Sequence, residues 1–514
     1  AAICFVLWRD RRMLLSPGNF VVLTVLFLVA LSLYLYLPIR TNAGAAIHWG
    51  DPNTFEKFVA HVTGRSHREV YFLQQNFLEY FHRTNQALSL VGAQLGFILV
   101  IGIWGLIRLR PHRWQLFFVL VIVFDFVYTV FLNVISLKVT PFALPTLLCL
   151  AILSGLGIAQ ALHWVHNHPG VGGATSKLVR ASWCFIPAIP LALNITSSDQ
   201  SSNCTAYEHA LNALRTPDYE SILLVEGDNH FFPVVYARIA EKMRPDLLLF
   251  DRHNILYEMP YVGEGKGLFV GKWEEYRRVL EKEIARRMLP LGIYYLTFVP
   301  DGVTLPGEFQ LVPAGILHKV ERKKGPSRPY RIKNAWRYYS TESFYEDFEK
   351  DFMTRQVQSH FFLRHAQYLF FAGKDKVAQR QLKNASVLGY DDSLLLSKAS
   401  ELLMDNGYYE EARIQLERAL ENKPGDVVNN SWGVYYYKKG EYRKAAEYFE
   451  KALELKPRDH FYLRNLGLAL YRAGEKREAL KAMRESLTIK GDQPDLLELI
   501  AQETEALGAE SHAR

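Results

Sequence analysis

The distribution of apolar residues divides this chain into two parts of different character. Five long segments with few or no charges lie within the first 195 residues, at roughly 19–37, 86–107, 114–135, 140–163 and 180–195. A helix rises about 1.5 Å per residue, so about 20 such residues can cross the ~30 Å apolar core of a bilayer. Backbone groups cannot stay unpaired in lipid, so each segment is predicted to be a helix. The sequence therefore predicts a polytopic α-helical membrane domain over residues 1–195, followed by a large water-exposed part.

Basic residues in the intervening loops indicate how these helices are oriented. They occur in alternate loops, as Arg9, Arg11 and Arg12, then Arg108, Arg110 and Arg113, then Lys177 and Arg180. Loops rich in lysine and arginine face the cytoplasm. The loop 38–85 and the chain after about residue 196 are therefore expected on the other side. We expect a multi-pass protein of the bacterial inner membrane with a periplasmic C-terminal half, or of the endoplasmic reticulum with a lumenal half in a eukaryote.

The first residues differ from a signal peptide. The apolar run AAICFVLW is followed by the basic run RDRR, whereas a secretory signal has its basic residues first. This order is typical of the end of a membrane span. We therefore expect further spans before residue 1.

Charge and cysteine content argue against several classes of partner. The formal net charge is +7, from 60 basic and 53 acidic residues, and much of the excess lies in the predicted cytoplasmic loops. This distribution gives no indication of a nucleic-acid partner. Of the four cysteines, Cys204 alone lies outside the apolar runs, so neither a disulfide framework nor a zinc site is expected. We predict no metal and no cofactor.

Residues 196–330 alternate between strand-like and helix-like patterns. The strand-like runs are SILLVEG (221–227), DLLLF (246–250), GIYYLTFV (292–299) and FQLVPAGILHKV (309–320), and the helix-like runs are 231–243 and 273–289. Such alternation predicts a small α/β domain with a partly parallel sheet. The run KKGPSRPY (323–330) is typical of a linker, and residues 331–357 are predicted to continue it.

Residues 358–510 contain an internal repeat. Glycines recur every 33 or 34 residues, each followed five residues later by an alanine: Gly373, Gly407, Gly440 and Gly474, with Ala378, Ala412, Ala445 and Ala479. One unit also has the tetratricopeptide (TPR) spacing, with Gly433, Tyr436, Ala445, Phe449, Ala452 and Pro457. The pattern predicts an α-solenoid of four repeats with a capping helix near 494–507. Such arrays bind proteins or peptides, or only support a neighbouring domain.

The external loop 38–85 is the most unusual stretch. It ends in an aromatic-rich run, REVYFLQQNFLEYF (68–81), which is typical of a helix lying at the bilayer surface. Arg40 and Arg65 are candidate ligands for a lipid phosphate, because a guanidinium donates paired hydrogen bonds to phosphate oxygens. Asp51, within WGDP, either caps a helix that begins at Pro52 or positions a hydroxyl or sugar.

Two ionisable residues lie in or near the third apolar segment. Asp125 lies within it, where a carboxyl group is expensive and either faces a cavity or partner or is held by hydrogen bonds. Lys138, at its outer edge, either meets a lipid phosphate or extends its amine to the interface. In the α/β domain, Asp228, His230 and Arg244 lie near strand ends, where ligands often bind. No metal-ligand spacing, Ser/His/Asp pattern or glycine-rich phosphate loop accompanies them.

Several of these motifs occur together in a known family. The sequences LPIR (37–40), HWGDP (48–52), Leu144-Pro145, GDN (227–229), YAR (236–238) and RPD (244–246) resemble the C-terminal part of a transmembrane family once known only as a domain of unknown function. Its animal members are O-mannosyltransferases of the polytopic GT-C superfamily, and many bacterial members carry terminal TPRs. The resemblance covers roughly residues 15–260.

The resemblance implies transfer of a sugar from a polyprenyl-phosphate donor to a protein or other hydroxyl acceptor outside the cytoplasm, with inversion. In the superfamily a carboxylate of the first external loop deprotonates the acceptor, while basic groups stabilise the departing lipid phosphate. That acidic loop is expected upstream of residue 1, so no catalytic base is named. Arg40, Trp49 and Asp51 are the matching loop positions and imply a supporting or donor-binding role. The donor is a substrate, and a protein or peptide partner is expected on the TPR surface.

Two other functions remain compatible with the sequence. The chain is also interpretable as a non-enzymatic membrane anchor whose TPRs scaffold an envelope or secretion complex. A polymer transferase such as an O-antigen ligase shares the layout of many spans followed by external TPRs. An acidic loop between two upstream spans would favour the sugar transferase over both.

Overall fold

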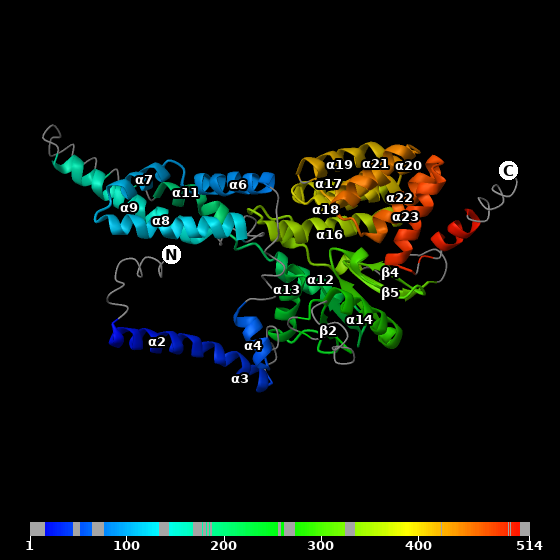
Figure 1. Cartoon of the computed structure of the whole chain (residues 1–514), viewed down its shortest axis with the longest axis horizontal. Coiled ribbons are helices and arrows are strands. Elements are labelled where there is room, and N and C mark those ends of the chain that lie inside the picture. The colour runs from blue at the N-terminus through cyan, green and yellow to red at the C-terminus, as the bar shows by residue number, and fades with distance from the viewer. Residues whose placement is uncertain are drawn as a thin grey trace. The chain divides into compact units, whose positions relative to one another are not determined.

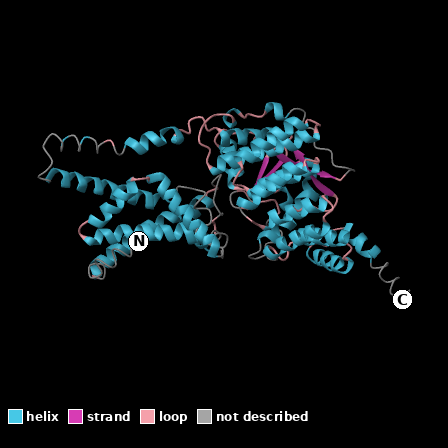
Figure 2. Cartoon of the chain, turned by 90° about the horizontal axis from the view of Figure 1, so that it is seen from above, coloured by secondary structure: helices cyan, strands magenta, loops and turns pink. Residues whose placement is uncertain are grey.

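The computed structural model describes residues 16–44, 52–63, 77–132, 143–167, 177, 181, 185, 188–254, 257, 259–261, 273–323, 335–422, 424–491, 493 and 495–503. The chain divides into two compact units, Ala1–Ser201 and Ser202–Arg514 (Figure 1). Helices make up most of the described residues, and the strands form one small sheet in the second unit (Figure 2). The predicted mainly helical architecture with a small sheet is confirmed.

The first unit is helical throughout its described part. Its elements are α2 (Pro17–Ser32), η1 (Leu33–Leu35), α3 (Tyr36–Asn42), α4 (Phe55–Val62), α6 (Phe77–Leu95), α7 (Ile98–Arg108), α8 (His112–Val127), the π-helical turn η2 (Tyr128–Leu132), α9 (Leu144–Asn167) and α11 (Ala188–Ser198). By length and composition, three stretches of described helix can cross a membrane: Pro17–Asn42, His112–Leu132 and Leu144–Val165. They overlap the first, third and fourth predicted segments.

The second predicted segment, 86–107, differs from the expectation of one straight span. The helix begins earlier, at Phe77, and breaks between α6 and α7 with a bend of 97°. Gly96 lies at the break with φ +51°, a conformation that glycine adopts without the clash a side chain would cause. If this bent pair is one span, the described helices include four candidates. The second half of the fifth segment, 180–195, lies in α11, and six residues of its first half lie outside the described residues.

Small residues bring α7 and α9 into close contact. A Cβ atom on Gly105 would lie 2.1 Å from the carbonyl oxygen of Leu153, and one on Gly157 would lie 2.3 Å from that of Ile101. The two backbones therefore touch where neither carries a side chain. Close approach through small residues is the usual way in which helices associate in lipid.

The second unit begins with the α/β part. The sheet has the order β2-β1-β3-β5-β4, with β1 (Ile222–Val225), β2 (Leu248–Asp251), β3 (Ile293–Leu296), β4 (Phe309–Ala314) and β5 (Leu317–Arg322). β1 pairs in parallel with β2 and β3, while β5 is antiparallel to β3 and β4. The structure thus contains the partly parallel sheet predicted from the alternating pattern.

Both faces of this sheet are covered, and for that reason all four residues of β1 and of β3 are buried. Leu223 and Val225 pack on the side of α12 (Thr205–Arg215) and α13 (Asp228–Ile239). Ile222 and Leu224 pack on the opposite side, against α14 (Trp273–Met288). Successive side chains of a strand point to opposite faces, so uninterrupted apolar runs are required here.

The C-terminal part is the predicted helical repeat. Four helix pairs follow one another: α16 (Phe352–Phe371) with α17 (Asp375–Leu388), α18 (Ser393–Asp405) with α19 (Tyr409–Asn422), α20 (Asp426–Lys438) with α21 (Tyr442–Leu455), and α22 (His460–Ala473) with α23 (Lys476–Ile489). The recurring glycines Gly373, Gly407, Gly440 and Gly474 have φ between +69° and +87° and lie between the two helices of each pair. Residues 495–503 are helical, as predicted for a capping helix.

Part of the predicted linker is packed into the core. Within 331–357, residues 335–338 form α15 (Ala335–Tyr338), and Ala335, Tyr339 and Phe344 are buried in a core that extends from the sheet to Tyr435 of α20. Trp336 stacks on His365 of α16, with ring centroids 4.5 Å apart. The aromatic residues of this stretch bury enough apolar surface to order it. As a result, the sheet and the repeats share one compact unit.

Candidate functional site

Most candidate residues of the external loop lie outside the described residues. These are Trp49, Asp51 and Arg65. Lys138, near the third apolar segment, also lies outside the described residues. Arg40 is described: it is exposed in the last turn of α3, where the apolar stretch Pro17–Asn42 ends. A cation near a helix C-terminus is favourable by itself, because it faces the negative end of the helix dipole. The donor-binding role of these residues stays a prediction.

Asp125 connects two helices. Its Oδ2 accepts hydrogen bonds from the backbone amide of Thr146, at 3.1 Å, and from the hydroxyl of the same residue, at 2.5 Å. Thr146 lies in the first turn of α9, where backbone amides have no partner within the helix. The carboxyl group of α8 thus serves as an N-cap for α9. Of the two interpretations of Asp125, this geometry favours the hydrogen-bonded structural one.

Asp125 is expected to stabilise the first unit through an acceptor oxygen and not through its charge. Asp125→Asn retains a carbonyl oxygen and should unfold within about 0.5 kcal/mol of the wild type, whereas Asp125→Ala should lose about 1–2 kcal/mol. The measurement is unfolding of the full chain by SDS in mixed micelles. Equal losses in both variants would show that the negative charge matters.

Arg83 was not among the residues that the sequence singled out. Its side chain is buried, and its Nε and Nη2 donate to the backbone carbonyls of Val130 and Thr129, each at 2.7 Å. Both carbonyls belong to η2, where the wider π-turn disturbs the regular helical pattern. Tyr80 and Phe131 add a ring contact at 5.1 Å. Arg83, two residues beyond the aromatic-rich run 68–81, thereby connects α6 to the end of α8.

A second polar cluster lies where the parallel strands end. Glu226 follows β1, Arg252 follows β2 and Thr297 follows β3, so the sheet brings them to one edge. Arg252 is fully buried and forms ion pairs with Glu226 and with Glu281 of α14, the latter at 2.7 Å. Glu226 also accepts from Thr297 and from Arg277. Two cations and two carboxylates therefore form a closed network.

The pKa values of the two carboxylates in this network shift in opposite directions. Burial by itself raises the pKa of Glu226, but Arg252, Thr297 and Arg277 together hold this pKa below its usual value. Burial raises the pKa of Glu281, which is fully enclosed, and Arg252 only partly offsets the effect. The charges of Arg252 and Arg277 are directed at these carboxylates. The arrangement favours a structural role over capture of an anionic ligand.

The residues Asp228, His230 and Arg244 do not form one site. Arg244 donates to the backbone carbonyls of Leu214 and Asp218 and pairs with Asp246 at 2.8 Å. The hydrogen bonds from Arg244 lower the pKa of Asp246 to about 2. Arg244 thus holds a loop on the side of the sheet where β2 begins, whereas Asp228 and His230 follow the end of β1.

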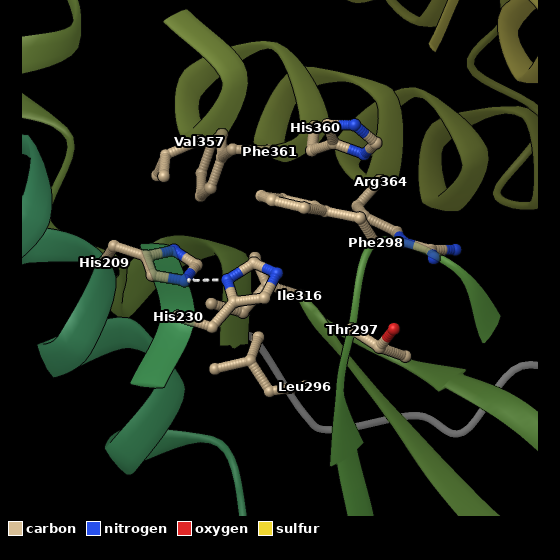
Figure 3. Close-up of a pocket in the computed structure, with 10 residues that line it drawn as sticks. All are labelled: His209, His230, Leu296, Thr297, Phe298, Ile316, Val357, His360, Phe361 and Arg364. Atoms are coloured by element: carbon tan, nitrogen blue, oxygen red, sulfur yellow. Dashed lines mark hydrogen bonds between the residues drawn. The ribbon is translucent and has the colours of Figure 1, made fainter. Parts of the chain in front are cut away.

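A small cavity lies between the sheet and α16 (Figure 3). The imidazoles of His209 and His230 are joined by a hydrogen bond of 2.8 Å between Nε2 and Nδ1. Phe298, which follows β3, lies between His230 and His360, with ring centroids 3.9 and 4.1 Å apart. The volume is about 20 Å³, enough for a water molecule and too little for a sugar or nucleotide.

The histidines of this cavity do not form a metal site. Within the described ranges, no group of three or more histidine, cysteine, aspartate or glutamate side chains is placed to hold a metal ion. Burial lowers the pKa of His209 to about 4 and lowers that of His230 well below its usual value. Both rings are therefore neutral at pH 7. The helical patterns in the sequence do not predict this cluster, because its members come from three separate helices.

Known proteins match the chain in two ways: a family model matches part of the repeats, and curated relatives match about half of the chain. A family model described as tetratricopeptide repeat matches residues 430–494. The protein O-mannosyl-transferase tmem260 of Dictyostelium discoideum is 23% identical over 309 residues, which cover 54% of this chain and 36% of that protein. The protein O-mannosyl-transferase TMEM260 of Mus musculus is 24% identical over 293 residues, which cover 50% of this chain and 39% of that protein.

Solved structures also match part of the chain. MamA, residues 41 to the end, from Desulfovibrio magneticus RS-1 is 18% identical and covers 30% of this chain and 90% of its own, with a TM-score of 0.26. PilF of Pseudomonas aeruginosa is 18% identical and covers 30% and 74%, with a TM-score of 0.27. The two sequence relatives and the family model confirm the predicted resemblance: the chain is similar over half its length to proteins named protein O-mannosyl-transferases, and it carries C-terminal tetratricopeptide repeats.

Proposed function

We propose that this chain acts in a membrane glycosyltransferase that moves a sugar from a polyprenyl-phosphate donor to a protein or other hydroxyl acceptor outside the cytoplasm. The observation that carries the proposal is the similarity, over half of the chain, to two proteins named protein O-mannosyl-transferases. The three apolar helices long enough to cross a membrane support it, because a lipid-linked donor must be reached from within a bilayer. The chain spans 36% and 39% of the lengths of these relatives.

Arg40 is the described residue best placed to bind the donor phosphate. It is exposed, and it lies at the end of an apolar helical stretch of 26 residues. Its guanidinium can donate two parallel hydrogen bonds to phosphate oxygens as negative charge develops on the leaving group. Asp125 is a poor candidate for the base that deprotonates the acceptor, since its Oδ2 already accepts two hydrogen bonds from Thr146.

The proposal is tested by transfer of a radiolabelled sugar from polyprenyl phosphate to protein acceptors, using the complete protein in its native membrane. Arg40→Ala should reduce transfer about 100-fold without lowering the amount of protein, because it removes a donor to the leaving group. Arg113→Ala is the matched control: Arg113 is also exposed at the end of an apolar helix, in the first turn of α8, but at the end predicted to face the cytoplasm.

Two results would count against the proposal. Wild-type transfer by Arg40→Ala would remove Arg40 from the site and leave the enzyme class intact. Absence of transfer by the wild-type protein from every polyprenyl-phosphate sugar would overturn the enzyme class itself.

A second function is favoured by the repeats alone. Four stacked helix pairs form a surface suited to binding a protein or peptide, so the chain can act as a membrane-anchored scaffold. A scaffold predicts that deletion of Ser393–Ile489 abolishes partner capture while sugar transfer is absent even in the wild type. Transfer that survives the deletion would support the enzyme and assign the repeats to acceptor recruitment.

A further inference from the structure

Four buried or half-buried basic side chains meet where the sheet packs against α16. His209 comes from α12, His230 from α13, and His360 and Arg364 from α16. The hydrogen bond between His209 and His230 and the position of Phe298 between His230 and His360 join these elements (Figure 3). The first helix of the repeat array thus meets the sheet through imidazole rings.

Several ring nitrogens of this cluster are buried without a hydrogen-bond partner in the described part of the chain. They are Nδ1 of His209, Nε2 of His230 and Nε2 of His360. A buried polar atom without a partner weakens the packing around it. A protein that required only a tight joint would gain stability from apolar residues at these positions.

Protonation of these histidines would destabilise the packing of α16 on the sheet in two ways, through buried charge and through loss of a hydrogen bond. A first proton on the His209–His230 pair keeps the hydrogen bond but places a cation in an apolar enclosure facing Arg364. A second proton leaves two N–H groups pointing at each other across 2.8 Å. The carboxylate on this side is Asp392, with Oδ2 3.7 Å from Nε2 of His360, and it favours a proton there.

We propose that this histidine cluster makes the joint between the sheet and the repeat array acid-sensitive, so that protonation loosens α16 from α12, α13 and the end of β3. The charged groups that face the cluster are Arg364 on α16 and Asp392 before α18, and Arg364 also acts electrostatically on the buried His318 of β5. The repeat array would respond to the pH of its surroundings, beyond any role in sugar transfer.

The direction of the effect follows from the histidines. In the unfolded chain a histidine titrates near pH 6.5, whereas burial lowers the pKa of His209 to about 4 in the folded chain. The opened state therefore binds more protons than the closed state between these values, and the closed state loses stability as pH falls. At pH 5 one such histidine favours opening about thirtyfold relative to pH 7.5.

The test is amide hydrogen exchange of the full chain in detergent micelles at pH 7.5 and 5.0, corrected for the intrinsic dependence of exchange on pH. Exchange of α12, α13 and α16 should rise at least about tenfold, while α20–α23 stay protected. Uniform exposure of every helix, or no change in α16, would overturn the proposal.

Two variants identify the groups responsible. His209→Phe combined with His230→Phe replaces both partners of the hydrogen bond by rings of similar shape and should remove most of the acid response. His365→Phe is the control: His365 is a half-buried histidine of α16, with a pKa lowered to about 4 by burial, but it stacks on Trp336 outside the cavity. If the acid response survived the double substitution and disappeared in His365→Phe, His365 would be the group responsible, and the proposal for His209 and His230 would be overturned.

A measurement on the wild type covers the case in which the double variant does not fold. Exchange of the histidine C2 protons gives the pKa of each histidine in the folded chain. Values for His209 and His230 well below 6 fit the proposal, whereas values near 6.5 would mean that these rings are solvated and would overturn it.

Discussion

Glu281→Ala is expected to destabilise the second unit by about 3–5 kcal/mol, because it removes one of the two carboxylates that compensate the buried charge of Arg252 and leaves this charge to Glu226. Both side chains of this ion pair are fully buried. The Nε of Arg252 donates to Oε1 of Glu281 at 2.8 Å, and the amide of Thr304 donates to Oε2 at 2.8 Å. Removal of the carboxylate therefore takes one acceptor from the Arg252 guanidinium and leaves the Thr304 amide without this carboxylate oxygen.

This loss is measured by urea-dependent protease susceptibility of the full chain in micelles, followed at α14. The control is Glu417→Ala, which removes an exposed ion pair with Arg413 one helical turn away and should change stability by less than about 0.5 kcal/mol. Arg252→Met combined with Glu281→Leu should recover much of the lost stability, since neither charge then remains buried. Similar stability of Glu281→Ala and Glu417→Ala would show that water reaches Arg252.

The sequence predicts the repeating and long-range apolar patterns well. The glycine spacing predicts the helix pairs from α16 to α23, and the alternating apolar runs predict a sheet with parallel strands. These features follow from periodicity, which a single sequence displays directly. The sequence does not predict the bend at Gly96, because hydropathy depends on composition and not on backbone angles.

Buried charged residues are harder to predict from the sequence, although the sequence pattern of α14 indicates two of them. Arg277 and Glu281 lie on the same face of α14 as the buried Tyr276, Leu280 and Ile284. At 3.6 residues per turn these positions point toward the sheet, so two charges occupy a predicted core face. Their partner Arg252 follows a different element, and only the parallel pairing of β1 and β2 brings it to Glu226.

In the first unit, the sequence indicates Asp125 as a candidate residue but does not indicate Arg83. Asp125 was identified because an acid within an apolar segment is unusual, yet its contact with Thr146 depends on how α8 and α9 pack. Arg83 was missed because it lies just outside the apolar segment, where arginine is common. Its bonds to η2 depend on a π-turn, which has no clear sequence pattern.

Gly157→Ala and Gly155→Ala are expected to have effects of opposite sign on the first unit, although the two positions lie two residues apart on α9. A Cβ at position 157 would meet the carbonyl oxygen of Ile101 at 2.3 Å, whereas nothing lies within 4 Å of a Cβ at position 155. The obstructing atom is backbone, so it cannot rotate away as a side chain does. The helices must separate, and this should destabilise the unit by about 1–3 kcal/mol.

Gly155→Ala isolates the intrinsic effect of the substitution. Alanine favours a helix over glycine by up to about 1 kcal/mol, so this variant should be as stable as the wild type or more stable. Gly105→Ala tests the same contact from α7, because its Cβ would lie 2.1 Å from the carbonyl oxygen of Leu153. Unfolding by SDS, followed by circular dichroism, compares all three. If Gly157→Ala and Gly155→Ala were equally stable, the close contact between α7 and α9 would be absent in the membrane, and the bent pair of α6 and α7 would need another support.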